Sequence, residues 1–165
     1  YLLRYPHGCI EQTTSAAFPQ LFVHQLLDLD EAQREKIPNN IRAAIRRIKN
    51  FQNQDGAFAY WPGSSRASEW GTNYAGHFLL EAQKRGYVVD GIMLDKWKKH
   101  QQREARLWQQ QSNLPRSSYQ QQRSDLMQAY RLYTLALANS PDLANMNRLR
   151  EYKDLKLQAL SLIHI

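Results

Sequence analysis

The chain has one cysteine, Cys9, and a glutamine, Gln12, follows it three positions later. If this segment is helical, residues three positions apart lie on one face, so the Cys9 sulfur can reach the Gln12 carboxamide carbon. A thiolate that attacks this carbon and expels ammonia leaves an internal thioester, an acyl group far more electrophilic than the amide it replaces. The first N–H groups of a helix favour the thiolate, which is the attacking form. The pair therefore predicts a reactive covalent bond between two side chains.

Cys9 also has simpler explanations. A lone cysteine is usually a small buried hydrophobic residue, and a cysteine three positions before a glutamine has no meaning by itself. Cys9 could also be the nucleophile of a thiol protease, but that role needs a partner histidine, which the sequence does not mark out. The residues that flank Cys9 favour the thioester over both alternatives.

Residues 5–15 read YPHGCIEQTTS and resemble the thioester motif of the alpha-2-macroglobulin and complement superfamily. The core of that motif is Gly-Cys-x-Glu-Gln, and the flanking Tyr-Pro and Thr-Thr-Ser are similar to its bacterial branch. The resemblance implies that Cys9 and Gln12 are the two ends of the bond and that Tyr5 shields it from water until activation. Gly8 allows a close backbone approach that a side chain would obstruct. The remaining positions expected to support the motif are Pro6 and Glu11.

Two further groups in the motif have alternative roles. Glu11 could orient the thiol or the leaving amide during bond formation, or it could be a first-turn carboxylate that stabilises the start of the helix. We expect Thr13, Thr14 and Ser15 to cap the helix and form local hydrogen bonds rather than to act as nucleophiles.

Composition indicates a folded, helix-rich chain: 42% of the residues are hydrophobic, 22% are charged and seven are glycine. The sequence contains no run of about 18 apolar residues, so it predicts no membrane-spanning helix. The net charge of +7 does not indicate nucleic-acid binding, because the basic residues are spread over several helical segments. We expect Arg42, Arg46, Arg47 and Lys49 to form the solvated face of one helix. No spacing of Cys, His or Asp resembles a metal site, and no cofactor is expected.

Apolar spacing predicts helices throughout the chain. In the first of them, Pro19 is tolerated if the helix starts near residue 15 or 16. Polar turn residues predict loops at 52–63 and 112–122. The segment 124–138 is apolar nearly all round, so its helix should be enclosed by others. The expected helices cover residues 16–29, 38–51, 68–84, 92–110, 124–138 and 143–152, and a last one begins near residue 155.

Helical pairs joined by Asp-Gly-x-Phe loops suit an alpha/alpha toroid, in which an inner ring of helices is sheathed by an outer ring. The patterns at 52–61 and 72–82 resemble the thioester domain of bacterial macroglobulins, so the resemblance covers residues 1–159. We expect an all-α chain that forms an incomplete toroid, about half of the ring. Residues 160–165 resemble the translation of a sequencing-library adaptor, and we expect them to be a non-native tail.

The family resemblance implies a function as part of a protease-trapping inhibitor. Cleavage of a bait region elsewhere in the parent protein would expose the thioester, and a lysine amine of the attacking protease would take the acyl group of Gln12. This chemistry is used once, so the chain is not expected to be an enzyme. The implied partners are target proteases and the other domains of the parent, without nucleic acid or metal. The implied location is the cell envelope, periplasmic or extracellular, with anchoring to the membrane through the parent.

The acceptor is expected to be an amine rather than a hydroxyl group. In complement-like relatives a distant histidine helps to transfer the acyl group to hydroxyls. The corresponding stretch here, 108–118, contains no histidine. The resemblance therefore favours lysine side chains over sugars.

A rival interpretation is an enzyme on the same toroid, such as a cyclase, a prenyltransferase or a carbohydrate-active enzyme. Asp28, Asp30 and Glu31 could form its acid motif, but helix capping explains them, and no second acidic cluster offers a paired acid and base. No histidine is a convincing catalyst either. His24 and His77 should be packed or hydrogen-bonded within helices, His7 flanks the motif and His100 belongs to a basic exposed face.

Overall fold

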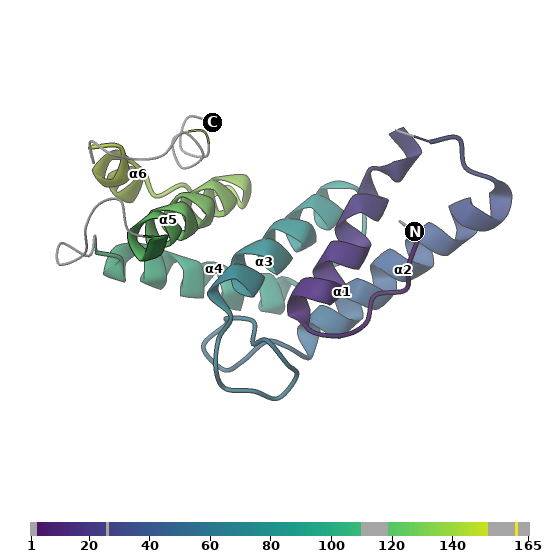
Figure 1. Ribbon diagram of the computed structural model, residues 1–165, viewed down its shortest axis with the longest axis horizontal. Helices are drawn as coiled ribbons and strands as arrows, with labels where there is room; N and C mark the ends of the chain where they lie inside the picture. Colours follow the sequence, from purple (N-terminus) through teal and green to yellow (C-terminus); the bar gives the residue numbers. More distant parts are fainter. Residues whose placement is uncertain (1–2, 26, 110–118, 152–160, 162–165) are drawn as a thin grey trace. The chain divides into compact units, whose positions relative to one another are not determined.

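The computed structural model describes residues 3–25, 27–109, 119–151 and 161, and this part of the chain is helical without any strand. Its two units, Tyr1–Trp97 and Lys98–Ile165, are described separately. The expected helix that begins near residue 155 lies outside the described residues. The elements in Figure 1 are helices α1 (Ile10–Ala17), α2 (Glu31–Lys49), α3 (Glu69–Lys84), α4 (Gly91–Leu107), α5 (Tyr119–Leu137) and α6 (Leu143–Arg150), with 3-10 turns η1 (Phe18–Leu21) and η2 (Val23–Gln25).

The first helix differs from the prediction, because α1 is formed by the motif itself. Cys9 is its N-cap, with an extended backbone, and the helix ends at Ala17. The chain then continues through η1 and η2 instead of one helix over 16–29. Pro19 explains the break, since it has no N–H for an α-helical interior but fits the first positions of a 3-10 turn.

Helix α2 begins two turns earlier than predicted, at Glu31 rather than at Pro38. A capping box starts it: the Asp30 carboxylate accepts from the Gln33 N–H at 2.8 Å, and the Gln33 side chain accepts from the Asp30 N–H at 3.2 Å. Pro38 lies inside the helix, where it removes one backbone donor. The cap and the packing of the helix outweigh that loss.

The later helices agree more closely with the sequence. Ser68 caps α3 by accepting from the Gly71 N–H at 3.1 Å, and the helix ends at Lys84, as predicted, shortly before Gly86 at φ +84°. Helix α4 lies within the predicted 92–110 apart from its first residue. Helix α5 begins at Tyr119, five residues before the predicted start, so the expected loop at 112–122 is partly helical; its residues 112–118 lie outside the described part.

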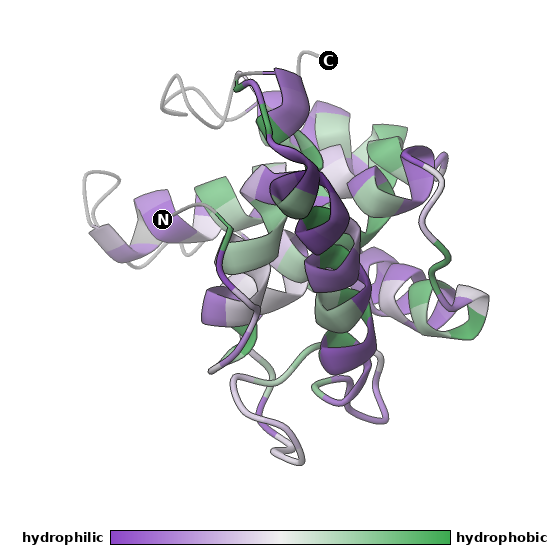
Figure 2. Cartoon of the chain, turned by 90° about the vertical axis from the view of Figure 1, so that its right-hand side faces the viewer, coloured by the Kyte–Doolittle hydropathy of each residue, from purple (hydrophilic) through white to green (hydrophobic). Residues whose placement is uncertain are grey.

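The first unit is built around the contacts of α1 with α2 and α3 (Figure 1). The loop between α2 and α3 is pinned by Phe58, whose ring is fully buried. The Thr72 hydroxyl accepts from the Phe58 N–H at 3.0 Å and donates to the Phe58 carbonyl at 3.2 Å. Each helix carries both hydrophobic and hydrophilic residues (Figure 2). Fully buried large side chains of this unit include Ile10, Ile41, Ile48, Phe51, Phe78, Leu79 and Trp97.

The second unit encloses α5, as its apolar composition predicted. Leu132 and Leu135 are fully buried and pack with Leu149 of α6. The buried surface also includes polar side chains that the apolar pattern did not reveal. Gln128 donates to the Ala105 carbonyl at 3.0 Å, and Arg131 donates to the Gln128 side-chain oxygen at 2.6 Å. Gln128 and Arg131 are thus paired, as a low-dielectric interior requires.

Gly76 tests the packing of the first unit. A Cβ at this position would lie 2.2 Å from the fully buried Trp97 indole, whose Nε1 donates to the Thr72 carbonyl at 2.9 Å. We expect Gly76→Ala to lower the free energy of unfolding by about 1–3 kcal/mol through overpacking. Gly91→Ala is the matched control, because a Cβ there meets open space. Urea denaturation measures both; equal values for the two variants would contradict the packing.

His77 makes the stability depend on pH. Burial lowers the pKa of His77, and the Glu81 carboxylate offsets part of this shift. Because the folded state binds the proton less readily, the stability from neutral His77 is complete above its ordinary pKa of about 6.5 and is lost as the pH falls through the folded pKa. We expect His77→Gln to reduce the loss of stability between about pH 7 and pH 5, whereas His24→Gln, at an exposed position, should not. Thermal unfolding at both pH values measures the difference.

Candidate functional site

The structure places the two residues predicted to react at the start of α1, with the Gln12 side chain against the Cys9 backbone. Cys9 is buried, with 2% of its surface exposed, while Gln12 lies on the exposed side of the helix. The Cys9 N–H donates to the Gln12 Oε1 at 3.1 Å. The pair has the arrangement of a capping box, in which each side chain faces the backbone N–H of the other residue. The Gln12 carbonyl group is therefore held beside the residue that carries the thiol.

Gly8 makes this approach possible. Its φ of +85° belongs to the left-handed region that favours glycine. A Cβ on Gly8 would lie 2.1 Å from Gln12 Oε1 and 3.0 Å from Gln12 Cδ. The carboxamide thus lies directly against the Gly8 backbone, where any side chain would displace it. Both the conformation and the contact explain why glycine precedes the cysteine.

Arg47 of α2 forms hydrogen bonds with the motif, and this role was not identified from the sequence. Its Nη2 donates to the Gly8 carbonyl at 2.8 Å, and its Nε donates to the Thr13 hydroxyl at 3.2 Å. Its guanidinium also lies 5.6 Å from the centre of the Phe51 ring. The prediction that Arg47 belongs to a solvated face is therefore wrong, because the side chain is half-buried against α1.

A signal for Arg47 does exist in the sequence. Arg47 continues the row of Asn40, Ala43 and Ala44 at helical spacing, and all three are buried. An arginine in such a row is expected to meet the neighbouring element rather than solvent. Arg42 and Arg46 lie outside this row, and they are exposed, as predicted.

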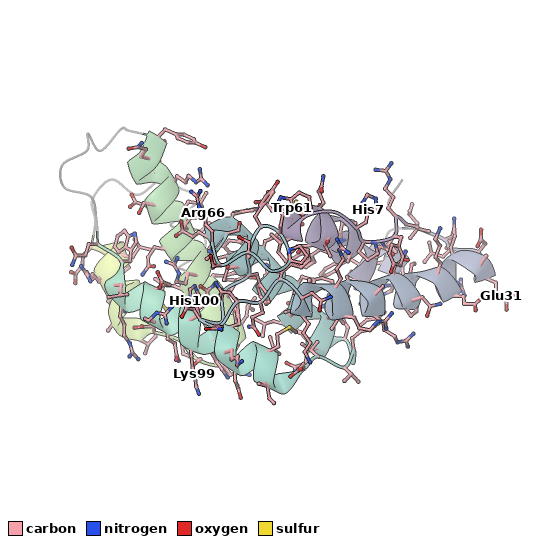
Figure 3. All side chains as sticks on the ribbon, turned by 90° about the horizontal axis from the view of Figure 1, so that it is seen from below. His7, Glu31, Trp61, Arg66, Lys99 and His100 are labelled. Carbon is pink, nitrogen blue, oxygen red and sulfur yellow. The ribbon has the colours of Figure 1, made fainter. Side chains whose placement is uncertain are left out.

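Tyr60 lies next to Cys9, and this position was not identified from the sequence either. Its carbonyl accepts from the Ile10 N–H at 3.1 Å, which places the loop between α2 and α3 at the start of α1. A hydrogen bond with the Cys9 side chain, followed by charge on that sulfur, raises the pKa of the Tyr60 hydroxyl. The Tyr60 ring meets Trp61 edge-on at 5.6 Å, and both rings are partly exposed. Figure 3 labels Trp61 in this loop and His7 just before α1.

Tyr5 lies on the other side of the motif, close to Gln12. Its side chain is 62% exposed, whereas Pro6 is buried. With Gln12 it lines a hollow of about 290 Å³ whose other lining residues are Arg4, His7, Ser15, Ala16 and Pro19. The exposed face of the carboxamide is therefore open to a small molecule. The shielding role expected for Tyr5 stays a prediction.

The segment that precedes the motif is fixed by a buried glutamine. The Gln20 side chain donates to the carbonyls of Arg4 and Ala16, both at 2.8 Å. Its oxygen accepts from the Asn40 side chain of α2 at 3.0 Å. Gln20 is 1% exposed, so its side chain is shielded from water, and its bonds tie the segment before the motif and the last turn of α1 to α2.

The hydroxyl groups of the motif form local hydrogen bonds, as predicted. Thr14 donates to the Ile10 carbonyl at 2.8 Å, and Thr13 and Ser15 donate to the carbonyls of His7 and Gln12. Glu11 is half-buried in the first turn of α1, where both of its proposed roles stay open.

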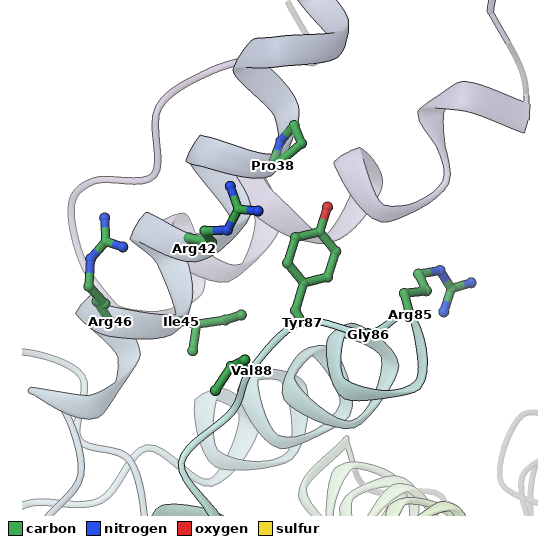
Figure 4. A pocket seen from close by; sticks show the side chains of 8 residues that line it. All are labelled: Pro38, Arg42, Ile45, Arg46, Arg85, Gly86, Tyr87 and Val88. Atoms are coloured by element: carbon green, nitrogen blue, oxygen red, sulfur yellow. The ribbon is translucent and has the colours of Figure 1, made fainter.

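A second hollow, of about 500 Å³, lies in the first unit beside the chain that joins α3 to α4 (Figure 4). The Arg42 guanidinium points toward Tyr87, where it partly opposes the rise in the Tyr87 pKa that burial causes. Arg85 is paired with Glu81 and lies 4.0 Å from the centre of the Phe22 ring. This basic hollow contains none of the motif residues.

Little in the structure supports the rival interpretation as an enzyme. Asp30 of the supposed acid motif is the N-cap of α2. Of the two histidines expected to be packed or hydrogen-bonded, His24 is exposed, whereas His77 meets the Phe18 ring edge-on at 4.9 Å. Most of the stretch 108–118, which contains no histidine, lies outside the described part, since residues 110–118 are not among the described residues.

Within residues 3–25, 27–109 and 119–151, no group of three or more His, Cys, Asp or Glu side chains is placed to hold a metal ion. None of the helices in the same ranges is long and apolar enough to cross a membrane.

The A-macroglobulin TED domain family matches residues 1–147 of the chain. The chain belongs to this family. Alpha-2-macroglobulin of Escherichia coli K12 is 35% identical over 92 residues, which are 53% of this chain and 6% of that protein. Salmonella alpha-2-macroglobulin reacted with methylamine is similar in structure, with a TM-score of 0.73 and 30% identity over 91% of this chain. The trypsin-activated Escherichia coli protein gives a TM-score of 0.72 and 26% identity over 89% of this chain.

These matches confirm the family and the fold class predicted from the sequence. The all-α chain has the fold of the alpha/alpha toroid in the TED domain of the bacterial alpha-2-macroglobulins. The chain spans about a tenth of the length of the two structures and 6% of the Escherichia coli protein. It therefore represents part of the TED domain of a much larger kind of protein.

Gly8 and Gly63 form a matched pair for testing the site. Both have positive φ, but a Cβ at Gly63 meets no atom, whereas one at Gly8 displaces the Gln12 carboxamide. Each change to Ala should lower the free energy of unfolding by about 1 kcal/mol because of the left-handed backbone. Gly8→Ala should also release the Cys9 N–H from Gln12, so the Cys9 amide hydrogen should exchange faster than in Gly63→Ala. Hydrogen–deuterium exchange measures this, and equal rates would contradict the geometry.

Proposed function

We propose that this chain is part of a protease-trapping alpha-2-macroglobulin, in which Cys9 and Gln12 form an internal thioester that captures the attacking protease. The observation that supports this most directly is the hydrogen bond from the Cys9 N–H to Gln12 Oε1, at 3.1 Å. It places the carbonyl group of one partner beside the residue that carries the thiol. Membership of the TED family supports the same function.

Bond formation is an exchange of one acyl substituent for another. The Cys9 sulfur attacks Gln12 Cδ, the C–N bond breaks, and ammonia leaves with the proton that the thiol gave up. Negative charge develops on Gln12 Oε1 during the attack, and the Cys9 N–H already points at this atom. A backbone donor aimed at a developing oxyanion stabilises the tetrahedral intermediate.

Capture reverses the roles of nitrogen and sulfur. A lysine amine of the protease attacks the same carbon, the C–S bond breaks, and sulfur leaves as the Cys9 thiol after a proton passes from nitrogen to sulfur. The product is an isopeptide at position 12. The sulfur side of the bond is buried and the Gln12 side is exposed, so the amine approaches from the hollow that Tyr5 lines. Each molecule reacts once, and the rate depends on holding the acyl group beside its target.

Two tyrosines flank the bond from opposite sides. Tyr5 on the Gln12 side shields the acyl carbon until the parent protein is activated. The hydroxyl of Tyr60, on the sulfur side, is protonated near neutral pH like that of any ordinary tyrosine, and it can donate to the departing thiolate.

The partners and the location follow from the same proposal. The chain acts together with the other domains of its parent, and cleavage of a bait region elsewhere in that parent starts the reaction. The targets are proteases with accessible lysine amines, and the parent is located in the cell envelope, anchored to the membrane. The similar Escherichia coli protein is described as activated by trypsin and the Salmonella protein as reacted with methylamine, which supports both protease activation and an amine acceptor.

The thioester is tested by the mass of the intact parent protein. The mass should be lower by one ammonia than the sequence requires, and methylamine should add at position 12 and release one thiol at Cys9. A thiol at Cys9 that reacts freely from the outset, together with an unmodified Gln12, would exclude the bond.

Cys9→Ala tests protease capture. This variant should keep the full mass and form no covalent conjugate with a protease, because no acyl group can be transferred. Ser64→Ala is the matched control: its exposed hydroxyl accepts from the Arg66 N–H and does not line the hollow beside Gln12, so capture should continue. Denaturing gels of each parent variant with trypsin show the conjugates. Conjugates that persist in Cys9→Ala would exclude the proposed chemistry.

A further inference from the structure

Two hydrogen bonds at the site share one peptide group. The carbonyl of Gly8 accepts from Arg47 Nη2 at 2.8 Å, and the N–H of Cys9 donates to Gln12 Oε1 at 3.1 Å. This carbonyl and this N–H are the two ends of the peptide bond between residues 8 and 9. That bond is trans, since no cis peptide occurs in the described chain, so its two polar groups point in opposite directions. The guanidinium of Arg47 and the acyl oxygen of Gln12 are therefore linked in series.

We propose that Arg47 is a positioning residue for the thioester chemistry, which holds and polarises the Gly8–Cys9 peptide group so that the Cys9 N–H acts as a stronger donor to the oxyanion at Gln12. This inference rests on the proposed function. It goes beyond that function because it assigns the electrostatic support of the reaction to a residue of α2, outside the motif.

The physical basis is the cooperativity of linked hydrogen bonds. A cation on a peptide carbonyl draws electron density toward the oxygen and leaves the N–H of the same peptide group more positive. The effect grows with the charge that develops on Gln12 Oε1, so it stabilises the tetrahedral intermediate more than the thioester itself. Both formation of the bond and its attack by an amine pass through such an intermediate.

Arg47 is suited to this role because its position is fixed. Its Nε donates to the Thr13 hydroxyl, and its guanidinium lies over the Phe51 ring. The planar group thus has contacts that orient Nη2 toward Gly8 without rearrangement during the reaction. Partial burial reduces the screening of its charge by solvent and salt.

Charge separates this role from simple bracing of the loop. If Arg47 only braced the loop, a neutral side-chain donor would serve nearly as well as a cation. If it polarises the peptide group, a shorter cation should serve better than the neutral donor. Arg47→Gln and Arg47→Lys make this comparison, and Arg46→Gln is the control, because Arg46 is exposed on the same helix and lines the separate basic hollow.

Intact mass first shows how much of each parent variant contains the thioester. The rate of its reaction with methylamine is then measured by the release of the Cys9 thiol. We expect Arg47→Gln to slow the reaction of thioester-containing molecules about tenfold, below the 10²–10³ that loss of a direct oxyanion donor costs. The rate of Arg47→Lys should stay within about threefold of the rate of the unsubstituted protein, and Arg46→Gln should react at the unsubstituted rate.

The outcomes distinguish this inference from the proposed function. Absence of the ammonia loss in the unsubstituted parent overturns both. Formation of the thioester with equal rates in Arg47→Gln and Arg47→Lys overturns only the role of charge at Arg47. If Arg47→Gln does not fold, Arg47→Lys decides alone: a folded Lys variant that reacts more than tenfold slower overturns the inference, and one near the unsubstituted rate supports it.

Discussion

The peptide group between Gly8 and Cys9 is the constraint on which the rest of the site depends. Its carbonyl is held by Arg47 and its N–H by Gln12, so its orientation fixes where the carboxamide lies. The left-handed backbone at Gly8 allows that orientation, and the missing Cβ leaves room for the carboxamide. Cys9 then enters α1 as an extended N-cap with its sulfur directed into the protein.

The fold around this peptide group separates a buried side from an exposed one. On the buried side, α1 packs on α2 and α3, and Ile10 is fully enclosed next to Gly71, where a Cβ would meet Ile10 at 2.5 Å. On the exposed side, Gln12 and Tyr5 border an open hollow. In the proposed function this division keeps the thiol buried, while an amine reaches the acyl carbon from the side that Tyr5 and Gln12 border.

Several polar groups of the site are buried, where the loss of a hydrogen-bond partner costs free energy. Gln20, Asn40 and Thr13 are buried and are joined to backbone or side-chain partners. Buried polar networks of this kind specify one arrangement of the elements, because a shift would leave several groups unsatisfied at once. The network links the segment before the motif, α1 and α2. The geometry of Cys9 and Gln12 is therefore set by residues that take no part in the proposed chemistry.

Sequence alone determined the features that depend on neighbours along the chain. The spacing of Cys9 and Gln12 decided which side chains could react, and the flanking motif indicated the family. Ser68 and Gly86 fixed the ends of α3, because caps act within one helical turn. Local rules were less successful where packing competes with them, as at Pro38, which lies inside α2 although proline favours a helix start.

Only the tertiary structure showed what supports the reactive pair. Arg47 reaches Gly8 across 39 positions of sequence, and Tyr60 reaches Cys9 from the loop between α2 and α3. These contacts exist because α1 lies against α2 at one particular place along the helices, and no spacing within either segment records where that place is. The sequence thus predicted the chemistry that we propose for the motif, and the packing of α1 on α2 decided which charge and which hydroxyl group lie beside it.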